Sequence, residues 1–470
     1  MTRMPPEPVL RAQQWIEEHE NWLIESTREL LRIPSVEGDP QPGAPFGAEV
    51  RRALDYVLAL CEAKGFRTKD VEGYAGHAEF GDTQPMVMSL GHLDVVPVSD
   101  GWKHEPFGAE IDDGYLYARG AVDDKGPTMA SLAAALALKE TGADLPARIR
   151  LVFGCNEESG FRCVKRYFET EEAPTYGIAP DSAWPCIHAE KGIANLLVTV
   201  PFPQGDLTLK RIEGGSRPNI VMDRCEAVAQ ASQEILGAVK TRATEYWDRN
   251  VQIEVEEDGT VTIVAHGKAA HGSTPFFGDS AFVRACRALL DLAPPEQATD
   301  YANLLLAGHP SGVGLGIHGR DDVSEDLTAN VGVVSTKDDA VEILVNVRYP
   351  VLWSGEDLER RCRQFLERER PGWSLTLRDN SPGLYFPTDQ EPVLSIVAAY
   401  REETGDDTEP GVMGGGTYAR AVPNTVSVGT GWPGDGPAHE NDERIKVEHL
   451  ARMAKIYAHI LYRLAHAAAK

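Results

Sequence analysis

The chain has 470 residues, which is enough for two to three domain-sized units with a large core. Its 46 basic and 72 acidic residues give a formal charge of −26, and such a field repels phosphate. We therefore expect neither nucleic acid nor an anionic membrane as a partner.

Seven cysteines occur, and no two of them form a C-x-x-C pair. An odd count without paired spacing argues against a disulfide framework and suits a reducing compartment, so we expect a cytoplasmic protein. The N-terminal run MTRMPPEPVLRAQQW lacks an apolar signal region. No run approaches the roughly 18 apolar residues of a membrane span.

Helical and strand patterns alternate through the first part of the chain. Apolar spacing predicts a helix over 9–32, ended by a proline, and a second helix over 47–64. Short apolar strands at 85–90 and 147–154 flank an Ala/Leu-rich helix at 127–139. The strand–helix–strand order predicts a mostly parallel α/β sheet.

The pattern changes near residue 192. Strand-like runs then mix with helices, which predicts a separate α+β domain over 192–383. The predicted strands are 193–201, 251–257, 260–267 and 340–350, and the predicted helices are 223–238 and 280–293. After 384 the α/β character returns, with helices at 391–403 and 446–468 around a strand at 424–431. We therefore predict one α/β domain, formed by 1–191 and 384–470, that is interrupted by an inserted domain.

Two acidic or histidine motifs follow the first predicted strands. In GHLD, His92 and Asp94 are two residues apart and point to one side of an extended chain. His92 can face a metal while Asp94 fixes its ring tautomer, although a histidine satisfied at a turn gives the same pattern. Asp123 and Asp124 precede a predicted helix, where carboxylates also serve as N-cap and first-turn acids.

Three further candidate sites, the first of them a pair of adjacent residues, come later in the chain. Glu157 and Glu158 follow the strand at 147–154 and point in opposite directions on an extended backbone. One carboxylate can then bind a metal while the other contacts its water; a charged loop is the alternative. Asp181 and His439 are ordinary loop residues when considered alone. Ligands of open α/β sheets bind beyond the carboxyl ends of strands, and this shared location makes all these positions candidates.

The order of the motifs is more specific than any one of them. GHLDVVP, a W-x3-PF run from Trp102 to Phe107, GYLYARGAVDDKGP, NEESG and PAHENDE follow one another along nearly the whole chain. In this order they resemble the aminoacylase/glutamate carboxypeptidase/desuccinylase family of two-zinc metallopeptidases, most closely its peptidase V group of carnosinase-like dipeptidases. The resemblance implies a mostly parallel α/β zinc-peptidase catalytic domain with an inserted α+β lid.

The resemblance also implies a pair of metal sites. Asp123 is expected to bridge two divalent ions, with His92 and Asp181 completing one site and Glu158 and His439 completing the other. Two histidines and three carboxylates suit Zn²⁺, with Mn²⁺ or Co²⁺ as alternatives. A shared carboxylate would hold the ions about 3.5 Å apart, as in other hydrolytic two-metal sites.

Other roles near the metals follow from the same resemblance. Glu157 is expected to act as the general base that takes a proton from the shared water and passes it to the leaving amine. Asp94 is expected to orient His92. The Asp123–Asp124 peptide is expected to be cis.

The inserted domain is expected to supply groups that bind the substrate. His271, in GKAAHGS, would donate to the developing oxyanion, although a turn histidine is the alternative. Arg348 lies on the polar face of its predicted strand and would bind the substrate carboxylate; a solvated edge arginine is the alternative. The other expected contacts are Asn219, Gly415, Gly416 and Thr417.

The residue at position 181 discriminates between activities in this family. An aspartate accompanies aminopeptidases and dipeptidases, whereas a glutamate accompanies carboxypeptidases, deacetylases and desuccinylases. Asp181 therefore predicts hydrolysis of dipeptides with a free C-terminal carboxylate, with an N-acyl-amino-acid deacylase as the alternative. A catalytically dead scaffold finds no support in the sequence, because both ligand sets and Glu157 are intact. The long inserted domain predicts a monomer that completes its own site.

Overall fold

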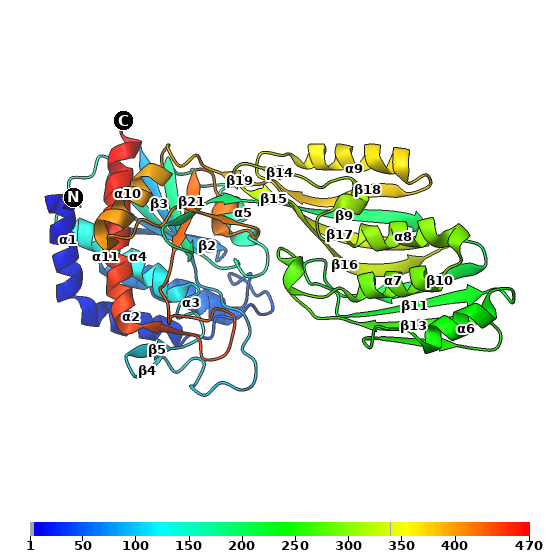
Figure 1. Ribbon diagram of the computed structural model, residues 1–470. Coiled ribbons are helices and arrows are strands. Elements are labelled where there is room, and N and C mark those ends of the chain that lie inside the picture. The colour runs from blue at the N-terminus through cyan, green and yellow to red at the C-terminus, as the bar shows by residue number, and fades with distance from the viewer. Residues whose placement is uncertain (1–3, 339) are drawn as a thin grey trace. The chain divides into compact units, whose positions relative to one another are not determined.

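The computed structural model describes residues 4–338 and 340–470, which form two compact units (Figure 1). Unit 1 contains the chain up to His188 together with Phe386–Gly411 and Gly416–Lys470. Unit 2 contains Ala189–Tyr385 and Val412–Gly415. The second unit interrupts the first, so the predicted insertion into an α/β domain is confirmed.

A mixed sheet forms the centre of unit 1, with the strand order β1-β2-β6-β3-β7-β21-β8 and β20 beside β8. The last strand of this sheet, β19, is part of the segment assigned to unit 2. The four neighbouring strands β6, β3, β7 and β21 run parallel, as predicted, and antiparallel strands widen the sheet on both sides. The strands are β1 (Arg67–Val71), β2 (Ala75–Phe80), β3 (Met86–His92), β6 (Arg148–Gly154), β7 (Tyr176–Ser182), β8 (Cys186–Glu190), β19 (Leu384–Tyr385), β20 (Gly411–Met413) and β21 (Thr425–Gly429).

Helices cover this sheet. They are α1 (Glu7–Glu18), α2 (Glu20–Leu31), α3 (Ala48–Ala63), α4 (Lys125–Glu140), α5 (Arg162–Tyr167), α10 (Val393–Thr404) and α11 (Val447–Ala468). The strands β4 (Glu110–Asp112), β5 (Tyr115–Tyr117) and β22 (Arg444–Lys446) form a small separate sheet. The helix predicted over 9–32 is divided at His19. Every side chain of α4 from Lys125 to Leu138 is buried, which explains why its sequence is apolar on all sides. The start of α4 therefore lies inside the unit.

Unit 2 is an antiparallel sheet with the order β12-β13-β11-β10-β16-β17-β9-β18. Its strands are β9 (Gly192–Pro201), β10 (Leu207–Gly214), β11 (Arg224–Ala231), β12 (Val251–Val255), β13 (Thr260–His266), β16 (Thr328–Lys337), β17 (Ala340–Tyr349) and β18 (Ser374–Ser381). The strands β14 (Arg320–Asp321) and β15 (Glu325–Asp326) form a separate two-stranded sheet. The helices are α6 (Leu236–Thr244), α7 (Ala281–Leu292), α8 (Ala298–Ala307) and α9 (Gly355–Glu369), and η1 (Pro275–Phe277), η2 (Pro295–Gln297) and η3 (Val313–Leu315) are short 3-10 turns. Burial alternates along β9 and β11, as expected for a sheet covered on one face.

The helix predicted over 223–238 is wrong. Residues Arg224–Ala231 form β11, which pairs with β10 and β13, and the helix α6 starts only at Leu236. Cys225, Ala227 and Ala229 are buried at every second position, which is the period of a strand. Alanine and glutamine favour helices locally, but pairing in the middle of a sheet outweighs that preference.

Candidate metal centre

The carboxyl ends of the parallel strands carry most of the candidate residues in unit 1. His92 is the last residue of β3, and Asp181 is the next-to-last residue of β7. Glu157 and Glu158 follow β6 after two intervening residues, and the loop with His439 follows β21. Neighbouring parallel strands end at the same edge of the sheet, so these side chains converge there.

The Asp123–Asp124 peptide, which enters helix α4, is cis, as the resemblance implies. Asp124 is completely buried, and its carboxylate accepts hydrogen bonds from the main-chain N–H of His92 at 3.1 Å and from Thr128 Oγ1 at 3.2 Å. A Cβ at Gly91 would lie 2.0 Å from Thr128 Oγ1, so only glycine fits beside this contact. Asp124 thus anchors the end of β3 to the start of α4.

Two groups of possible metal ligands share Asp123. One group is His92, Asp123 and Asp181, the other is Asp123, Glu158 and His439, and the donor atoms of each group lie within 4.8 Å of one another. Asp123 Oδ1 is 3.1 Å from His92 Nε2, and Asp123 Oδ2 is 3.0 Å from His439 Nε2. The five predicted ligands therefore come together, with one oxygen of Asp123 directed to each group.

The donor set fits two divalent cations. Ligands of a tetrahedral site with bonds near 2.1 Å are separated by about 3.4 Å, and zinc prefers imidazole and carboxylate donors. His439 Nε2 lies 3.0 Å from Asp123 and 3.1 Å from Glu158, close to this spacing. Three carboxylates packed against one another also need positive charge nearby.

The pKa values of these groups reflect the same crowding of charges. Burial raises the pKa of Asp181 well above its usual range, and the charge of Asp123 adds to the rise. Burial opposes protonation of His92, but its hydrogen bond to Asp123 and the neighbouring acids raise the pKa of the ring. Hydrogen bonds to Asp123 and Glu158 raise the pKa of His439 to about 10. Protons and cations compete for these donors, so metal affinity should fall in acid.

Asp94 and Glu157 lie beside the ligands. His92 Nδ1 is 2.9 Å from the main-chain oxygen of Asp94 but 3.7 Å from its carboxylate. The Asp94 carboxylate instead accepts the main-chain N–H groups of Glu157 and Glu158, each at 3.1 Å. Asp94 thus contacts His92 through its backbone, while its side chain holds the loop after β6. Burial, with a contribution from the Glu158 charge, raises the pKa of Glu157 to about 7.

Glu443 lies four residues after His439 and was not predicted from the sequence. Glu443 is fully buried, and its Oε1 accepts the main-chain N–H groups of Val122 at 3.0 Å and Asp123 at 3.2 Å. Its other oxygen accepts a hydrogen bond from the buried guanidinium of Arg119. One carboxylate thus connects the loops that carry the shared Asp123 and His439.

Tyr418 is a second residue of the site that was not predicted from the sequence. Its buried ring packs edge-on against His92, with ring centroids 6.1 Å apart, and its hydroxyl is 2.6 Å from Cys163 Sγ. A Cβ at Gly154 would lie 1.9 Å from that hydroxyl, so the end of β6 needs a glycine to admit the ring. Tyr418 therefore restrains the orientation of the His92 imidazole.

Unit 2 brings Asn219 and His271 together. The main-chain N–H of Gly272 donates to the main-chain carbonyl of Asn219 at 2.7 Å, and Ile220 forms a β-bridge with His271. His271 Nδ1 accepts the main-chain N–H of Ser273 at 3.2 Å, so the neutral ring carries its proton on Nε2. Burial and the charge of Arg348 lower the pKa of His271, which favours this neutral form.

Arg348 lies on β17, an interior strand between β16 and β9, and only 5% of the residue is exposed. The alternative of a solvated edge arginine is therefore wrong. Its Nε donates to Asn346 Oδ1 at 3.0 Å, and its Nη1 donates to the Gly414 carbonyl at 2.9 Å. Two fixed acceptors thus hold the guanidinium in one orientation.

The predicted substrate loop is shared by the two units. Gly415 belongs to unit 2, whereas Gly416 and Thr417 belong to unit 1. Thr417 caps the short 3-10 helix η4 (Tyr418–Ala421), and its Oγ1 accepts a hydrogen bond from Ser427 at 2.8 Å. The hydroxyl of Thr417 therefore has a structural partner within unit 1.

An α/β sheet with paired metal-ligand groups at the ends of its parallel strands defines a metal-dependent hydrolase. The chain belongs to the peptidase family M20/M25/M40, whose model matches residues 88–463. It is 35% identical over 458 residues to "Putative dipeptidase YtjP" of Bacillus subtilis. The alignment of the two proteins covers 94% of this chain and 97% of that protein. A protein of Staphylococcus epidermidis, also named "Putative dipeptidase", is 35% identical over 461 residues, or 95% and 98% of the two chains.

Two solved structures share the fold. Human carnosine dipeptidase 1 aligns with a TM-score of 0.56 at 17% identity, over 98% of this chain and 100% of that chain. The aminoacylhistidine dipeptidase of Vibrio alginolyticus aligns with a TM-score of 0.57 at 14% identity, over 93% and 96%. At these identities the likeness concerns the fold alone.

Proposed function

We propose that the protein hydrolyses dipeptides, or other short peptides with a free C-terminal carboxylate, with the help of two divalent ions. The observation that carries the proposal is Asp123, whose two oxygens face His92 on one side and His439 on the other. The names of the relatives, which cover nearly the whole chain, support a dipeptidase. The finer assignment to the peptidase V group rests on the sequence motifs.

The residues of unit 1 would divide the chemistry among them. His92 and Asp181 would hold one ion, Glu158 and His439 the other, and Asp123 would bridge them. Two ions held there would act as Lewis acids that polarise the peptide carbonyl and acidify water. Glu157 would accept the proton of the attacking water and deliver it to the leaving amine.

Groups of unit 2 would bind the substrate. His271 would donate its Nε2–H to the developing oxyanion, a role that its neutral tautomer supports. Arg348 would bind the C-terminal carboxylate through charge-assisted hydrogen bonds. Asn219 and the loop of Gly415, Gly416 and Thr417 would approach the substrate backbone. We assign these roles from the resemblance and from the local geometry of each unit.

The metal, oligomeric state and compartment are finer parts of the proposal. We propose Zn²⁺ first, with Mn²⁺ or Co²⁺ as alternatives, because the donors are mixed nitrogen and oxygen. We propose a monomer because the inserted domain is long, Ala189–Tyr385. Seven free, buried cysteines support a cytoplasmic location. No helix among residues 4–338 and 340–470 has the length and apolar character needed to cross a membrane.

A substrate panel tests the function directly. Metal-stripped protein is supplied with Zn²⁺ or Mn²⁺ and assayed on free dipeptides, on their N-acetylated counterparts and on N-acetyl amino acids. We expect cleavage of the free dipeptides, loss of that activity with a chelator, and up to two ions bound per chain. Cleavage of N-acetyl amino acids alone would identify a deacylase. No cleavage of either class by metal-loaded protein would contradict the proposal.

A further inference from the structure

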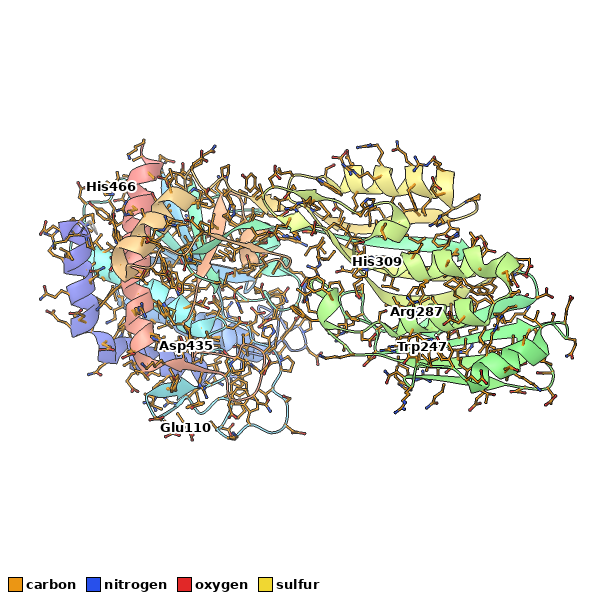
Figure 2. All side chains as sticks on the ribbon, viewed as in Figure 1. Glu110, Trp247, Arg287, His309, Asp435 and His466 are labelled. Atoms are coloured by element: carbon orange, nitrogen blue, oxygen red, sulfur yellow. The ribbon has the colours of Figure 1, made fainter. Side chains whose placement is uncertain are left out.

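A row of polar side chains crosses three neighbouring strands of unit 2, starting at Arg348. The strands are β17, β9 and β18, which lie side by side in Figure 1, and Figure 2 shows the side chains that they carry. Asn346 lies two residues before Arg348 on β17 and therefore points to the same face of the sheet. The strand register pairs Asn346 with Asn195 on β9, and it pairs Asn195 with Asp379 on β18. Side chains that oppose one another in this way lie on one face and can interact.

Hydrogen bonds connect the four side chains in series. Arg348 Nε donates to Asn346 Oδ1 at 3.0 Å, and Asn346 Nδ2 donates to Asn195 Oδ1 at 2.8 Å. Asn195 Nδ2 in turn donates to Asp379 Oδ2 at 3.2 Å. The register of β18 shifts between Leu377 and Asp379, and this irregularity brings Asp379 opposite Asn195. Each link of the series therefore joins one donor to one acceptor.

The two ends of the series fix the direction of both amides. A guanidinium can only donate hydrogen bonds, so Asn346 turns its oxygen toward Arg348 and its NH₂ group toward Asn195. An ionised carboxylate can only accept them, so Asn195 turns its NH₂ group toward Asp379 and its oxygen toward Asn346. Both ends thus require the same arrangement, and hydrogen bonds in such a series strengthen one another.

The inner part of the series lies in the interior of unit 2. Only 3% of Asn346 and 5% of Arg348 is exposed, whereas Asn195 is half-buried and Asp379 is exposed. A buried amide costs free energy unless its polar atoms are hydrogen-bonded, so the bonds to Arg348 and Asn195 stabilise Asn346 in this place. Arg348 Nη1 also donates to the Gly414 carbonyl. The orientation of the guanidinium thus depends on Asn346, and that of Asn346 depends on Asn195.

We propose that Asn346 and Asn195 are positioning residues that hold the Arg348 guanidinium in the orientation that binds the C-terminal carboxylate of the substrate. The inference rests on the proposed function, in which Arg348 binds that carboxylate. A carboxylate recognises the planar guanidinium through N–H groups in a fixed fork, so a rotated plane binds it less well. The two amides prevent this rotation before the peptide arrives, and such preorganisation increases affinity.

Asn346→Leu tests the inference, because leucine has a similarly branched side chain but makes no hydrogen bond. We expect KM for Ala-Ala to rise about three- to tenfold, the loss typical of one hydrogen bond, while kcat changes less than about twofold. KM for the C-terminal amide of Ala-Ala should stay as in the natural protein, since that peptide brings no carboxylate to Arg348. Glu342→Gln, on the same strand and face but outside the series, is the matched control and should leave both KM values unchanged.

A double-mutant cycle separates positioning from a general loss of structure. In an Arg348→Ala background there is no guanidinium to hold, so adding Asn346→Leu should not raise KM further. Asn195→Ala replaces a half-buried residue and should raise KM for Ala-Ala about two- to fivefold, again only where Arg348 is present. The second variant keeps the inference testable if the leucine variant folds poorly.

The outcomes distinguish this inference from the function on which it rests. Native KM for Ala-Ala in the two asparagine variants, with KM raised in Arg348→Ala, would overturn the inference and leave the proposed function intact. Effects of Asn346→Leu and Arg348→Ala that multiply in the double variant would also overturn it. Native KM in Arg348→Ala would refute the carboxylate role of Arg348 and this inference together. Failure of the natural protein on all dipeptides would instead contradict the proposed function.

Discussion

The Glu443 carboxylate and the Arg119 guanidinium form a fully buried ion pair, with 2.6 Å between Oε2 and Nη1. Glu443 also accepts the main-chain N–H of Asp123, the residue shared by both metal-ligand groups. Since His439 lies only four residues earlier, the pair joins two ligand loops that are distant in sequence. Residues that position ligands in this way contribute to metal affinity without touching the metal.

Glu443→Ala should therefore weaken metal binding and destabilise unit 1. The change leaves the Arg119 charge buried and unpaired, which costs about 3–5 kcal/mol, and it frees the backbone before Asp123. Metal titration and thermal unfolding measure the two effects. Glu443→Gln keeps an oxygen for the two N–H groups and should lose less metal affinity than Glu443→Ala. Native metal affinity in the alanine variant would show that the pair does not position the ligands.

Glu157→Gln should remove turnover and leave both ions bound. Glu157 belongs to neither ligand group, and loss of a general base typically lowers kcat by about 10²–10⁴-fold. The neighbouring Glu158→Gln is the matched control, because it should lower metal content together with activity. Metal analysis and kcat for the two variants separate the roles. A Glu157→Gln variant with native kcat would exclude this residue as the base.

The sequence predicted the elements that carry the site because their patterns are strong. The apolar runs ending at His92 and Gly154 are buried strands, and the long terminal helix follows a helical period. The prediction that five ligands come together rested on the order of the motifs and on the family resemblance that this order carries. Asp181 and His439 have no local pattern that distinguishes them from other loop residues. Their proximity depends on how the parallel strands are ordered, which periodicity does not report.

Glu443 shows why other residues escaped prediction. It lies in the acidic run HENDE with Glu440 and Asp442, which has the composition of a solvated loop. Only the folded loop reveals that Glu443 is buried while Glu440 is exposed. Asp94 likewise contacts His92 through its backbone and the loop after β6 through its side chain. The sequence does not indicate this arrangement, because it depends on the fold. The strand Arg224–Ala231, by contrast, had a detectable period of two.

Arg348→Ala should raise KM for dipeptides by about 10–100-fold, the loss expected for hydrogen bonds to a charged group worth about 1.5–3 kcal/mol. Arg348→Lys keeps the charge but loses the planar fork, so its KM should lie between those of the natural protein and the alanine variant. Steady-state kinetics on Ala-Ala and on its C-terminal amide provide the measurement. Equal KM for the free and amidated peptides in the natural protein would refute the carboxylate role.

His77 should make stability depend on pH. Burial and the nearby charge of Arg150 lower its pKa to about 4, and the Tyr167 hydroxyl lies 2.7 Å from its Nδ1. The folded protein thus keeps His77 neutral, whereas the unfolded chain binds a proton below its usual pKa of about 6.5. The stabilising contribution is complete above that pH and is lost as the pH falls toward 4, by about 3 kcal/mol in all.

His77→Gln keeps a hydrogen-bonding group beside Tyr167 but cannot titrate. Its unfolding midpoint should therefore fall less steeply than that of the natural protein between pH 7 and 4. The metal-binding residues titrate in both proteins, so the difference between the two curves isolates His77. Thermal unfolding of chelator-treated protein at a series of pH values provides the curves. Parallel curves would mean that the His77 pKa in the folded protein is close to its unfolded value.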